Sequence, residues 1–508
     1  MKGPEPARAL FDRGIRAVGG RARARVVSTL AATLAVDGAD KGAVSAMAPQ
    51  LRDTFGINNI QIGLLVSVVA LSGAVFTIPV GLLADRTRRT RLLALSVTLW
   101  VAAMILAGAS PSYGWLLSSR AALGAVSATA GPTIASLMGD YFPIKERARM
   151  YGLVLAGELV GTGLGFALSG SIGSFLTWRF AFWWLVIPGS ALVWFLRRLP
   201  EPARGGQARP AGDQEHTLDE REVPEGGDRG EPQQTAQPPE AGRQDGDPAG
   251  EAARRARVEP HEHLVLDSDP REASKWWSVR YVLRVRTNVV LIMASALGYF
   301  YFTGLRSFAT LYTTDHYGLS TSVATSLALV VGVGALGGVL SGGRIADRLL
   351  SGGRVNARAL VPTVCMLTVP VFIASALYTT SLAVALPLLM VGTLLLGAAN
   401  PPLDAARLDI LPPLLWGTGE GVRTMLRTLC EAAAPTLFGY FSTTVFAGHG
   451  GDSGTALEYT LLFFLLTLVA AGLLGLVAMR SYPRDVATAE ASTQRIEKSL
   501  RAPGEREH

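Results

Sequence analysis

Cysteine, histidine and charged residues are all scarce in this 508-residue chain. Its two cysteines, Cys365 and Cys430, both fall within apolar runs, so no disulfide framework is indicated. Six histidines occur, and none forms the Cys/His clusters that bind metal ions. The sequence also lacks a phosphate-binding loop and any credible catalytic pairing of acids, or of serine with histidine. We therefore expect no cofactor, no ATP hydrolysis and no enzymatic activity.

The shortage of charge points to a membrane. Only 17% of the residues are charged and 49% are hydrophobic, whereas soluble domains average about 25% charged residues. Apolar runs of roughly 20 residues, long enough to cross the hydrocarbon core as helices, alternate with short loops. The net charge of +7 is also compatible with nucleic acid or an anionic surface as partner. We favour membrane topology as the reason for the positive charge, because every second loop is basic and positively charged residues stay in the cytoplasm. This predicts a multi-pass protein of the plasma (inner) membrane with both termini cytoplasmic.

One stretch between two apolar runs occurs twice. The sequence from Gly81 to Arg86 returns 262 residues later as Gly343 to Arg348. The same offset carries the stretch 53–58 onto 315–320. Two matches at the same offset, without a gap, indicate that the chain contains one membrane unit as an internal repeat.

The fold class predicted is therefore an all-α membrane protein with twelve transmembrane helices in two six-helix, pseudo-symmetric bundles. The predicted spans are 26–49, 60–83, 92–110, 115–138, 150–172, 179–196, 288–312, 321–343, 358–378, 382–403, 422–446 and 457–479.

The remaining segments are polar. We predict a basic cytoplasmic tail at 1–25, a first bundle at 26–198, a linker at 199–275, a second bundle at 276–482 and a cytoplasmic tail at 483–508. The linker is rich in Pro, Gly, Glu, Arg and Gln, so we expect it to be mostly disordered. Trp276 and Trp277 favour a lateral helix at the membrane surface. A short helix is expected at 486–500.

These features resemble the major facilitator superfamily. The stretch 81–89 is similar to its loop signature, with Arg88 where a glycine is usual, and 120–124 resembles its fourth-span motif. A narrower resemblance is to the Spinster branch, which moves lysolipids and sphingolipid-like amphiphiles. It rests on Asp40-Lys41, Phe55-Gly56 and the 81–86 loop, which align with the spacing of that branch without a gap. Drug:proton antiporters of the superfamily share much of this layout.

The first span carries Asp37, Asp40 and Lys41 near mid-bilayer, where each ionisable group costs about 2.5–3.5 kcal/mol. Asp37 and Lys41 are four residues apart and can meet on one helix face. The Spinster resemblance implies that Asp40 is the proton-linked acid, with Lys41 as its basic partner. A static Asp37–Lys41 bridge that only fixes packing is the alternative.

Two further acids occupy matching places in the halves. Glu158 and Glu431 are 273 residues apart, as are Gly124 and Gly397. Arg427 precedes Glu431 by four residues, which predicts an ion pair, either beside the cavity or as packing at the cytoplasmic ends. Glu158 has no basic residue nearby in the sequence, and it is the second candidate for carrying the proton.

Candidate substrate-binding residues come from the fourth and seventh spans, in addition to Arg427 and Glu431 of the eleventh. The resemblance makes Arg120 a cavity cation, and Ser127 stands where Spinster-type chains often carry a glutamate. In the seventh span Tyr299, Tyr301 and their aromatic neighbours precede Arg306, an arrangement that suits an apolar tail with an anionic head. Ordinary lipid-facing aromatics are the alternative.

The repeated loop is the candidate gate. Its glycine, Gly81, allows a tight turn, and its charged residues lie at the cytoplasmic mouth. The resemblance implies gating roles for the acid and the arginines, and pseudo-symmetry extends these roles to the second copy of the loop. The alternative is that these charges only set the membrane topology. The charged residues concerned are Asp85, Arg86, Arg89, Asp347 and Arg348.

We therefore expect a proton-coupled secondary transporter of amphiphilic organic molecules, lysolipid-like or hydrophobic drug-like, that works by alternating access and exports or moves its substrate. Its partners would be the substrate, protons and the bilayer, without nucleic acid, and the protein is expected to be a monomer. A symporter of small organic anions and a transport-inactive sensor or scaffold of the same fold stay open.

Overall fold

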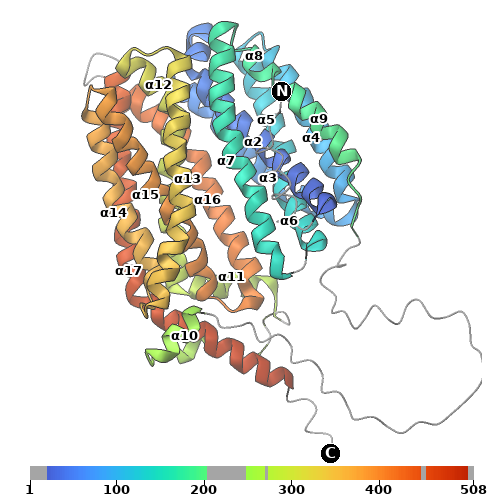
Figure 1. Cartoon of the computed structure of the whole chain (residues 1–508), viewed down its shortest axis with the longest axis vertical. Coiled ribbons are helices and arrows are strands. Elements are labelled where there is room, and N and C mark those ends of the chain that lie inside the picture. The colour runs from blue at the N-terminus through green and yellow to red at the C-terminus, as the bar shows by residue number, and fades with distance from the viewer. Residues whose placement is uncertain are drawn as a thin grey trace, which may run out of the picture.

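The computed structural model describes residues 20–142, 144–202, 248–268, 270, 273–447 and 453–501, and these ranges contain helices and turns but no β-strand. Figure 1 shows the helices of the first half, blue to teal, beside those of the second half, yellow to red. The first half comprises α2 (Arg21–Phe55), α3 (Asn59–Arg86), α4 (Arg89–Gly108), α5 (Tyr113–Ser127), α6 (Ala130–Tyr141), α7 (Ile144–Phe175), α8 (Phe180–Trp183) and α9 (Val186–Arg197).

The second half begins after a segment that contains α10 (Pro248–Arg255) and the 3-10 turn η2 (Glu262–Leu264). Its helices are α11 (Lys275–Arg284), α12 (Arg286–Tyr317), α13 (Thr321–Ser351), α14 (Ala357–Tyr378), α15 (Leu382–Asp409), α16 (Trp416–Tyr440) and α17 (Ser453–Arg501). The 3-10 turn η3 (Pro413–Leu415) precedes α16, and the π-helical turn η4 (Phe441–Val445) follows it.

Every predicted span falls on a helix or on a pair of consecutive helices. Within the described residues, eight stretches are long and apolar enough to cross a membrane: those in α3, α4, α8–α9, α12, α13, α14, α15 and α17. The other four predicted spans lie in α2, α5–α6, α7 and α16. Three of these, α2, α7 and α16, carry the ionisable residues considered below, which lower their mean hydropathy. The all-helical membrane fold is thus confirmed.

The internal repeat is also visible in the backbone. Gly56 ends α2 with φ 62°, and Gly318 ends α12 with φ 64°. Both residues therefore adopt the left-handed conformation that glycine tolerates best at a helix end. A second matched pair lies deeper: a Cβ on Gly124 would lie 2.2 Å from the Val69 carbonyl oxygen, and one on Gly397 would lie 2.3 Å from the Ala335 carbonyl oxygen. The two halves use equivalent glycines for equivalent helix contacts.

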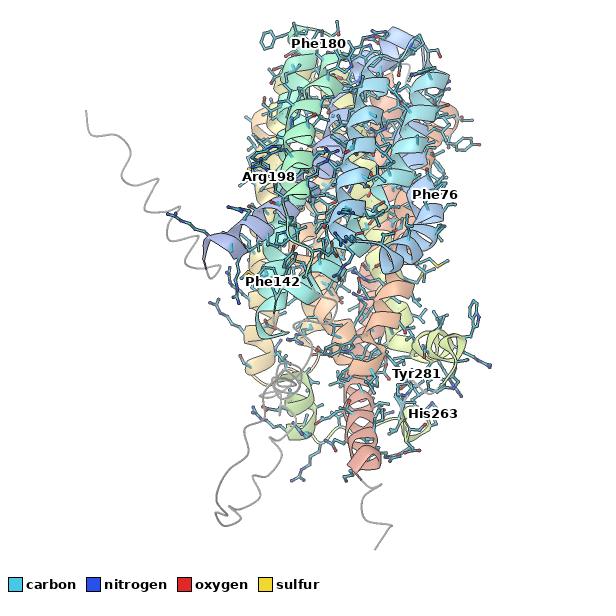
Figure 2. All side chains as sticks on the ribbon, turned by 90° about the vertical axis from the view of Figure 1, so that its right-hand side faces the viewer. Phe76, Phe142, Phe180, Arg198, His263 and Tyr281 are labelled. Atoms are coloured by element: carbon cyan, nitrogen blue, oxygen red, sulfur yellow. The ribbon has the colours of Figure 1, made fainter. Side chains whose placement is uncertain are left out.

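The molecule has two distinct ends (Figure 1). We call the end with α10 and the C-terminal part of α17 the linker end, and the opposite end, where α8 lies, the far end. Figure 2 places Phe180 at the far end and His263 and Tyr281 at the linker end. Because successive helices reverse direction, α2 and α12 both run from the linker end to the far end.

Polar contacts between the halves of the described chain lie toward the far end. Arg52 donates two hydrogen bonds to the Asp315 carboxylate, at 2.8 and 3.0 Å. Two further bonds join α3 to α16 and its π-helical turn: Asn59 Nδ2 to Ser442 Oγ at 3.0 Å, and Thr436 Oγ1 to Ser67 Oγ at 2.8 Å. The halves are therefore held together at the far end.

The predicted disorder of the linker is wrong for its last part. Within 248–268, helix α10 buries Ala249 and Ala253, and the following segment lies along α17. The backbone N–H of His261 donates to Thr488 Oγ1, and that of Leu266 donates to Ser492 Oγ. Small apolar side chains and α17 hydroxyl groups allow this otherwise polar segment to pack. Residues 203–247 lie outside the described ranges.

The C-terminal tail is also more regular than predicted. The expected helix at 486–500 exists, but it is the continuation of α17, which passes through Pro483 without interruption. The expected lateral helix is α11, which ends at Arg284 just before α12 begins, and Trp276 on it is 83% exposed.

Candidate functional site

Close packing of α2 against α7 positions the first group of charges. A Cβ placed on Gly157, Gly161 or Gly165 would lie 2.0–2.4 Å from a backbone oxygen of α2. The four-residue spacing of these glycines puts them on one helix face, where they allow close helix contact. Because the two backbones touch, short side chains of α2 can reach α7.

Lys41 lies at the centre of a three-residue group, the Lys41 triad. Its Nζ is 2.8 Å from Asp37 Oδ2 on the same helix and 2.8 Å from Glu158 Oε1 on α7. The predicted Asp37–Lys41 pair is confirmed. The bridge to Glu158 was not predicted, because the two residues are 117 positions apart. One ammonium group thus serves two carboxylates.

Asp40 has a different partner from the one that we predicted. Its Oδ1 accepts a hydrogen bond of 2.6 Å from Arg120 on α5, and both side chains are only 3% exposed. The pairing of Asp40 with Lys41 is therefore wrong: Asp40 points toward α5 and Lys41 toward α7. A buried pair of this kind is costly to separate, since removing either partner leaves an uncompensated buried charge.

The second half contributes two arginines and an acid from α12 and α16. Arg427 Nε is 3.1 Å from Glu431 Oε1, which confirms the predicted pair. The Arg427 guanidinium also lies 4.5 Å from the centre of the Tyr299 ring, a cation–π distance. Glu158 of the first half lies within electrostatic range of both Arg306 and Arg427. The charges of the two halves therefore face each other.

Arg306 has the fewest partners of these cations. Its Nε is buried without a hydrogen bond in the described part of the chain, and its guanidinium is 5.9 Å from the Phe302 ring. The carboxylates within its electrostatic range are Glu431, Glu158 and Asp37. Arg306 is thus a cation with spare hydrogen-bonding capacity.

Two of the predicted site residues lie elsewhere. Tyr301 is fully buried and packs against Phe438, so it belongs to the core of the second half rather than to a substrate-binding surface. Ser127 lines a cavity of about 20 Å³ within the first half, which it shares with Asp37, Thr33 and Ser96. Its lining is mostly apolar.

Three members of the candidate gate, Gly81, Asp85 and Arg86, lie in the last turns of α3, and their side chains lie outside the described residues. Arg89 is 3% exposed, and its Nε donates to Glu201 Oε1 at 3.1 Å.

Glu201 in turn caps the N-terminus of α4. Its carboxylate accepts the backbone N–H groups of Arg89 and Thr90, at 3.2 and 2.8 Å, and the Thr90 hydroxyl at 2.6 Å. Partial burial raises the pKa of Glu201, but these hydrogen bonds outweigh it and hold the pKa below its usual value. No pattern in the sequence indicated this contact, since Glu201 lies at the start of the predicted linker.

In the second copy of the loop, Asp347 pairs with Arg358 of the same half at 3.0 Å. Arg358 also bonds Asp409 at 2.6 Å, and Tyr482 of α17 donates to that same carboxylate. Arg348 is exposed. The acid of this loop therefore fastens α13 to α14 and, through Arg358, to α15 and α17.

A charged network at the linker end of α15 and α16 was not predicted. Asp404 accepts from Arg407 at 3.1 Å and from Arg423 at 2.9 Å, and Glu420 pairs with both arginines. The three-residue spacing of acid and arginine in each helix was the available signal, but the pairing between helices was not visible. Helix α15 continues through Pro401 and Pro402.

Comparison with known proteins gives one family match: the model described as Major Facilitator Superfamily covers residues 30–435. Among curated proteins, the chain is similar to Protein spinster of Drosophila melanogaster, 27% identical over 187 residues. That alignment covers 37% of this chain and 31% of the relative. The chain is also 30% identical over 168 residues to the Probable 4-methylmuconolactone transporter of Cupriavidus pinatubonensis, covering 32% of this chain and 39% of that relative. The matches thus span about a third of the relatives' own length.

Among solved structures, the chain is similar to a bacterial homologue of the human lysosomal transporter Spinster, in an inward-facing and occupied conformation. The TM-score is 0.69 at 18% sequence identity, and the match covers 91% of this chain and 98% of that chain. At this identity the likeness concerns the fold, and it extends over both halves.

Proposed function

The chain belongs to the Major Facilitator Superfamily, and on that premise we propose that it is a proton-coupled secondary transporter of amphiphilic organic molecules that works by alternating access. The observation that carries the proposal is the sharing of Lys41 between Asp37 and Glu158, beside the arginines of the second half. This group can change its charge by one proton without losing all of its ion pairs.

Glu158 is the better proton carrier of the two candidate acids. Its side chain is 37% exposed, so a proton can reach it. When Glu158 is protonated, Lys41 keeps its bridge to Asp37, and no cation is left alone. Protonation of Asp40 would instead leave Arg120 buried and unpaired, at a cost of about 3–5 kcal/mol. The geometry therefore favours Glu158 over Asp40, and it gives the Asp40–Arg120 pair a structural role.

A change of charge at Glu158 also alters the attraction between the halves. An ionised Glu158 attracts Arg306 and Arg427 of the second half, whereas a protonated one does not. Alternating access requires that the halves rock about such a central site. Proton binding at Glu158 would then bias which end is open.

The linker end is assigned to the cytoplasm, on the basis of the basic loops that the sequence places there. With that assignment both termini are cytoplasmic, and the closure by Arg52–Asp315 lies on the outer side. The conformation described here is then inward-facing. We assign the protein to the inner membrane as a monomer.

The substrate proposed carries an anionic group on an apolar body. Arg306 has a buried Nε with unused hydrogen-bonding capacity, and Tyr299 and Phe302 offer ring faces near the two arginines. An arginine with free donors binds phosphate or carboxylate groups well. A lysolipid has this chemistry, and so has an acidic drug-like molecule. A small organic anion shares only the head group and would bind Arg306 without using the rings.

Transport in proteoliposomes tests the proposal. We expect an imposed pH gradient to drive accumulation of a fluorescent lysolipid, and Glu158→Gln to reduce that accumulation at least tenfold while substrate exchange at equal pH continues. Glu259→Gln, an exposed acid in the linker-end segment, is the matched control and should behave as wild type.

Three outcomes would contradict parts of the proposal. Undiminished pH-driven uptake in Glu158→Gln would refute the assignment of the proton carrier. Accumulation of short organic anions, but not of acylated compounds, would favour the symporter reading. A folded protein that moves no lysolipid, lipophilic drug or organic anion would favour a transport-inactive sensor.

A further inference from the structure

A pocket of about 480 Å³ lies away from the proposed transport site, between the linker-end parts of α4 and α9. Its polar lining includes Arg88, Arg91 and Arg197, and its apolar lining includes Ala94, Leu95 and Leu196. The lining therefore combines cationic and apolar side chains. Nothing in the proposed transport cycle uses it.

The charge of this pocket is not balanced. Arg88, Arg91 and Arg197 are all exposed, and none of them has a carboxylate within 4 Å in the part of the chain that the structure describes. The acid in the lining, Glu201, is held by Arg89 and by the N-terminus of α4. Three arginines thus face an opening in which none of the described carboxylates pairs with them.

The surface that continues from the pocket is apolar. Along α4, Leu95 and Leu99 are 56% and 49% exposed, and along α9, Ile187 is 74% exposed. Trp194 is half exposed, and the Arg198 guanidinium (labelled in Figure 2) lies 3.7 Å from its ring. A tryptophan beside an arginine at the end of a span is typical of the membrane–water interface. The pocket therefore opens where lipid head groups meet acyl chains.

We propose that this pocket binds the phosphate head group of an anionic glycerophospholipid, whose acyl chains lie along the exposed apolar residues of α4 and α9. Arginine donors match phosphate oxygens in a two-point geometry. The apolar surface distinguishes a lipid from a free phosphate ion, which would use only the arginines. This site does not depend on the proposed proton coupling.

Native mass spectrometry of the delipidated protein provides the test. We expect phosphatidylglycerol to bind more tightly than phosphatidylcholine with the same acyl chains. The double variant Arg91→Gln/Arg197→Gln should weaken phosphatidylglycerol binding on the order of 25-fold, about fivefold per arginine. The control Arg284→Gln/Arg286→Gln removes the same charge from exposed positions outside the pocket and should leave the affinity unchanged.

Three results would overturn the proposal: equal binding of the two lipids by the wild type, equal loss in the pocket and control variants, or displacement of phosphatidylglycerol by inorganic phosphate at equimolar concentration. The last result would identify a site for a free anion. Unfolding curves for each variant, in the same detergent, verify that the pocket variant is folded. If that variant unfolds, the single substitution Arg197→Gln should still weaken binding about fivefold.

Discussion

The Asp40–Arg120 pair gives the sharpest test of how charge is arranged in the first half. Asp40→Asn removes the carboxylate charge while keeping the shape of the side chain. Arg120 is 3% exposed, so it cannot reach water when its partner is neutral. Removing one member of a buried pair costs about 3–5 kcal/mol, because the remaining charge is left uncompensated. We expect Asp40→Asn to lose that much stability.

The double variant Asp40→Leu/Arg120→Met should recover most of this loss. It removes both charges and fills the space with apolar side chains of similar size, and such replacements are often neutral or stabilising. We expect the double variant to lie within about 1 kcal/mol of the wild type. Equilibrium unfolding in mixed micelles, followed by tryptophan fluorescence, measures all the variants on one scale.

The same variants separate stability from coupling. If Asp40 only holds the first half together, the double variant retains pH-driven uptake, whereas Glu158→Gln loses it. Our reasoning would be refuted if Asp40→Asn were as stable as the wild type within about 1 kcal/mol and yet abolished the response to pH. Asp40 would then be the proton carrier, as the family resemblance originally implied.

Three further predictions concern helix packing, closure and capping. Gly161→Leu should destabilise the protein by at least about 1–3 kcal/mol in the same unfolding assay, because even its Cβ would lie 2.0 Å from the Ala35 carbonyl oxygen. Arg52→Gln should increase thiol labelling of a cysteine introduced between the halves from the far side, because the two charge-assisted bonds to Asp315 are lost. Glu201→Ala should cost about 1 kcal/mol at pH 7, as the loss of a helix cap does. Because the folded-state pKa of Glu201 is lowered, this contribution is present in full above the unfolded value of 4.5 and disappears as the pH falls through the folded value.

Each of these predictions has a contrary outcome. Gly332→Leu is the packing control, since nothing lies within 4 Å of its Cβ position; equal losses at both glycines would show that packing is not the cause. Unchanged labelling in Arg52→Gln would mean that other contacts close the far end. A cost at Glu201 that does not decline as the pH falls would point to a role of the backbone rather than of the carboxylate.

Contacts within one helix, and the repeat itself, were predictable from the sequence. The pairs Asp37–Lys41 and Arg427–Glu431 follow from four-residue spacing, which fixes the direction of both side chains on a single helix. The equivalence of Gly56 and Gly318 follows from the ungapped register of the two copies. These inferences need only the geometry of one helix.

Contacts between helices were not predictable in the same way. Asp40 and Lys41 are neighbours in sequence, but they point about 100° apart on a helix. Which of them meets Arg120 and which meets Glu158 depends on how α5 and α7 are rotated about their axes. The glycines of α7 lie on its packing face, but their spacing does not identify α2 as the partner.

Polar composition misled the interpretation of the linker. A polar segment was expected to lack order because it cannot bury enough apolar surface of its own. Residues 248–268 instead use the surface of α17, including the hydroxyl groups of Thr488 and Ser492. The composition of a segment does not show what another part of the chain offers it.

The linker is attached to the helices at both of its ends, and this has a mechanical consequence. Glu201 fastens its beginning to α4 in the first half, and the docked residues 248–268 fasten its end to α17 in the second half. A chain as long as the intervening residues 203–247 spans at most roughly 150 Å when fully extended, which sets an upper limit on the separation of the two anchor points. If the halves rock as proposed, progressive deletion within 203–247 would leave turnover unchanged until the remaining chain is too short, and the length at which turnover falls would measure how far the two anchor points separate in the membrane.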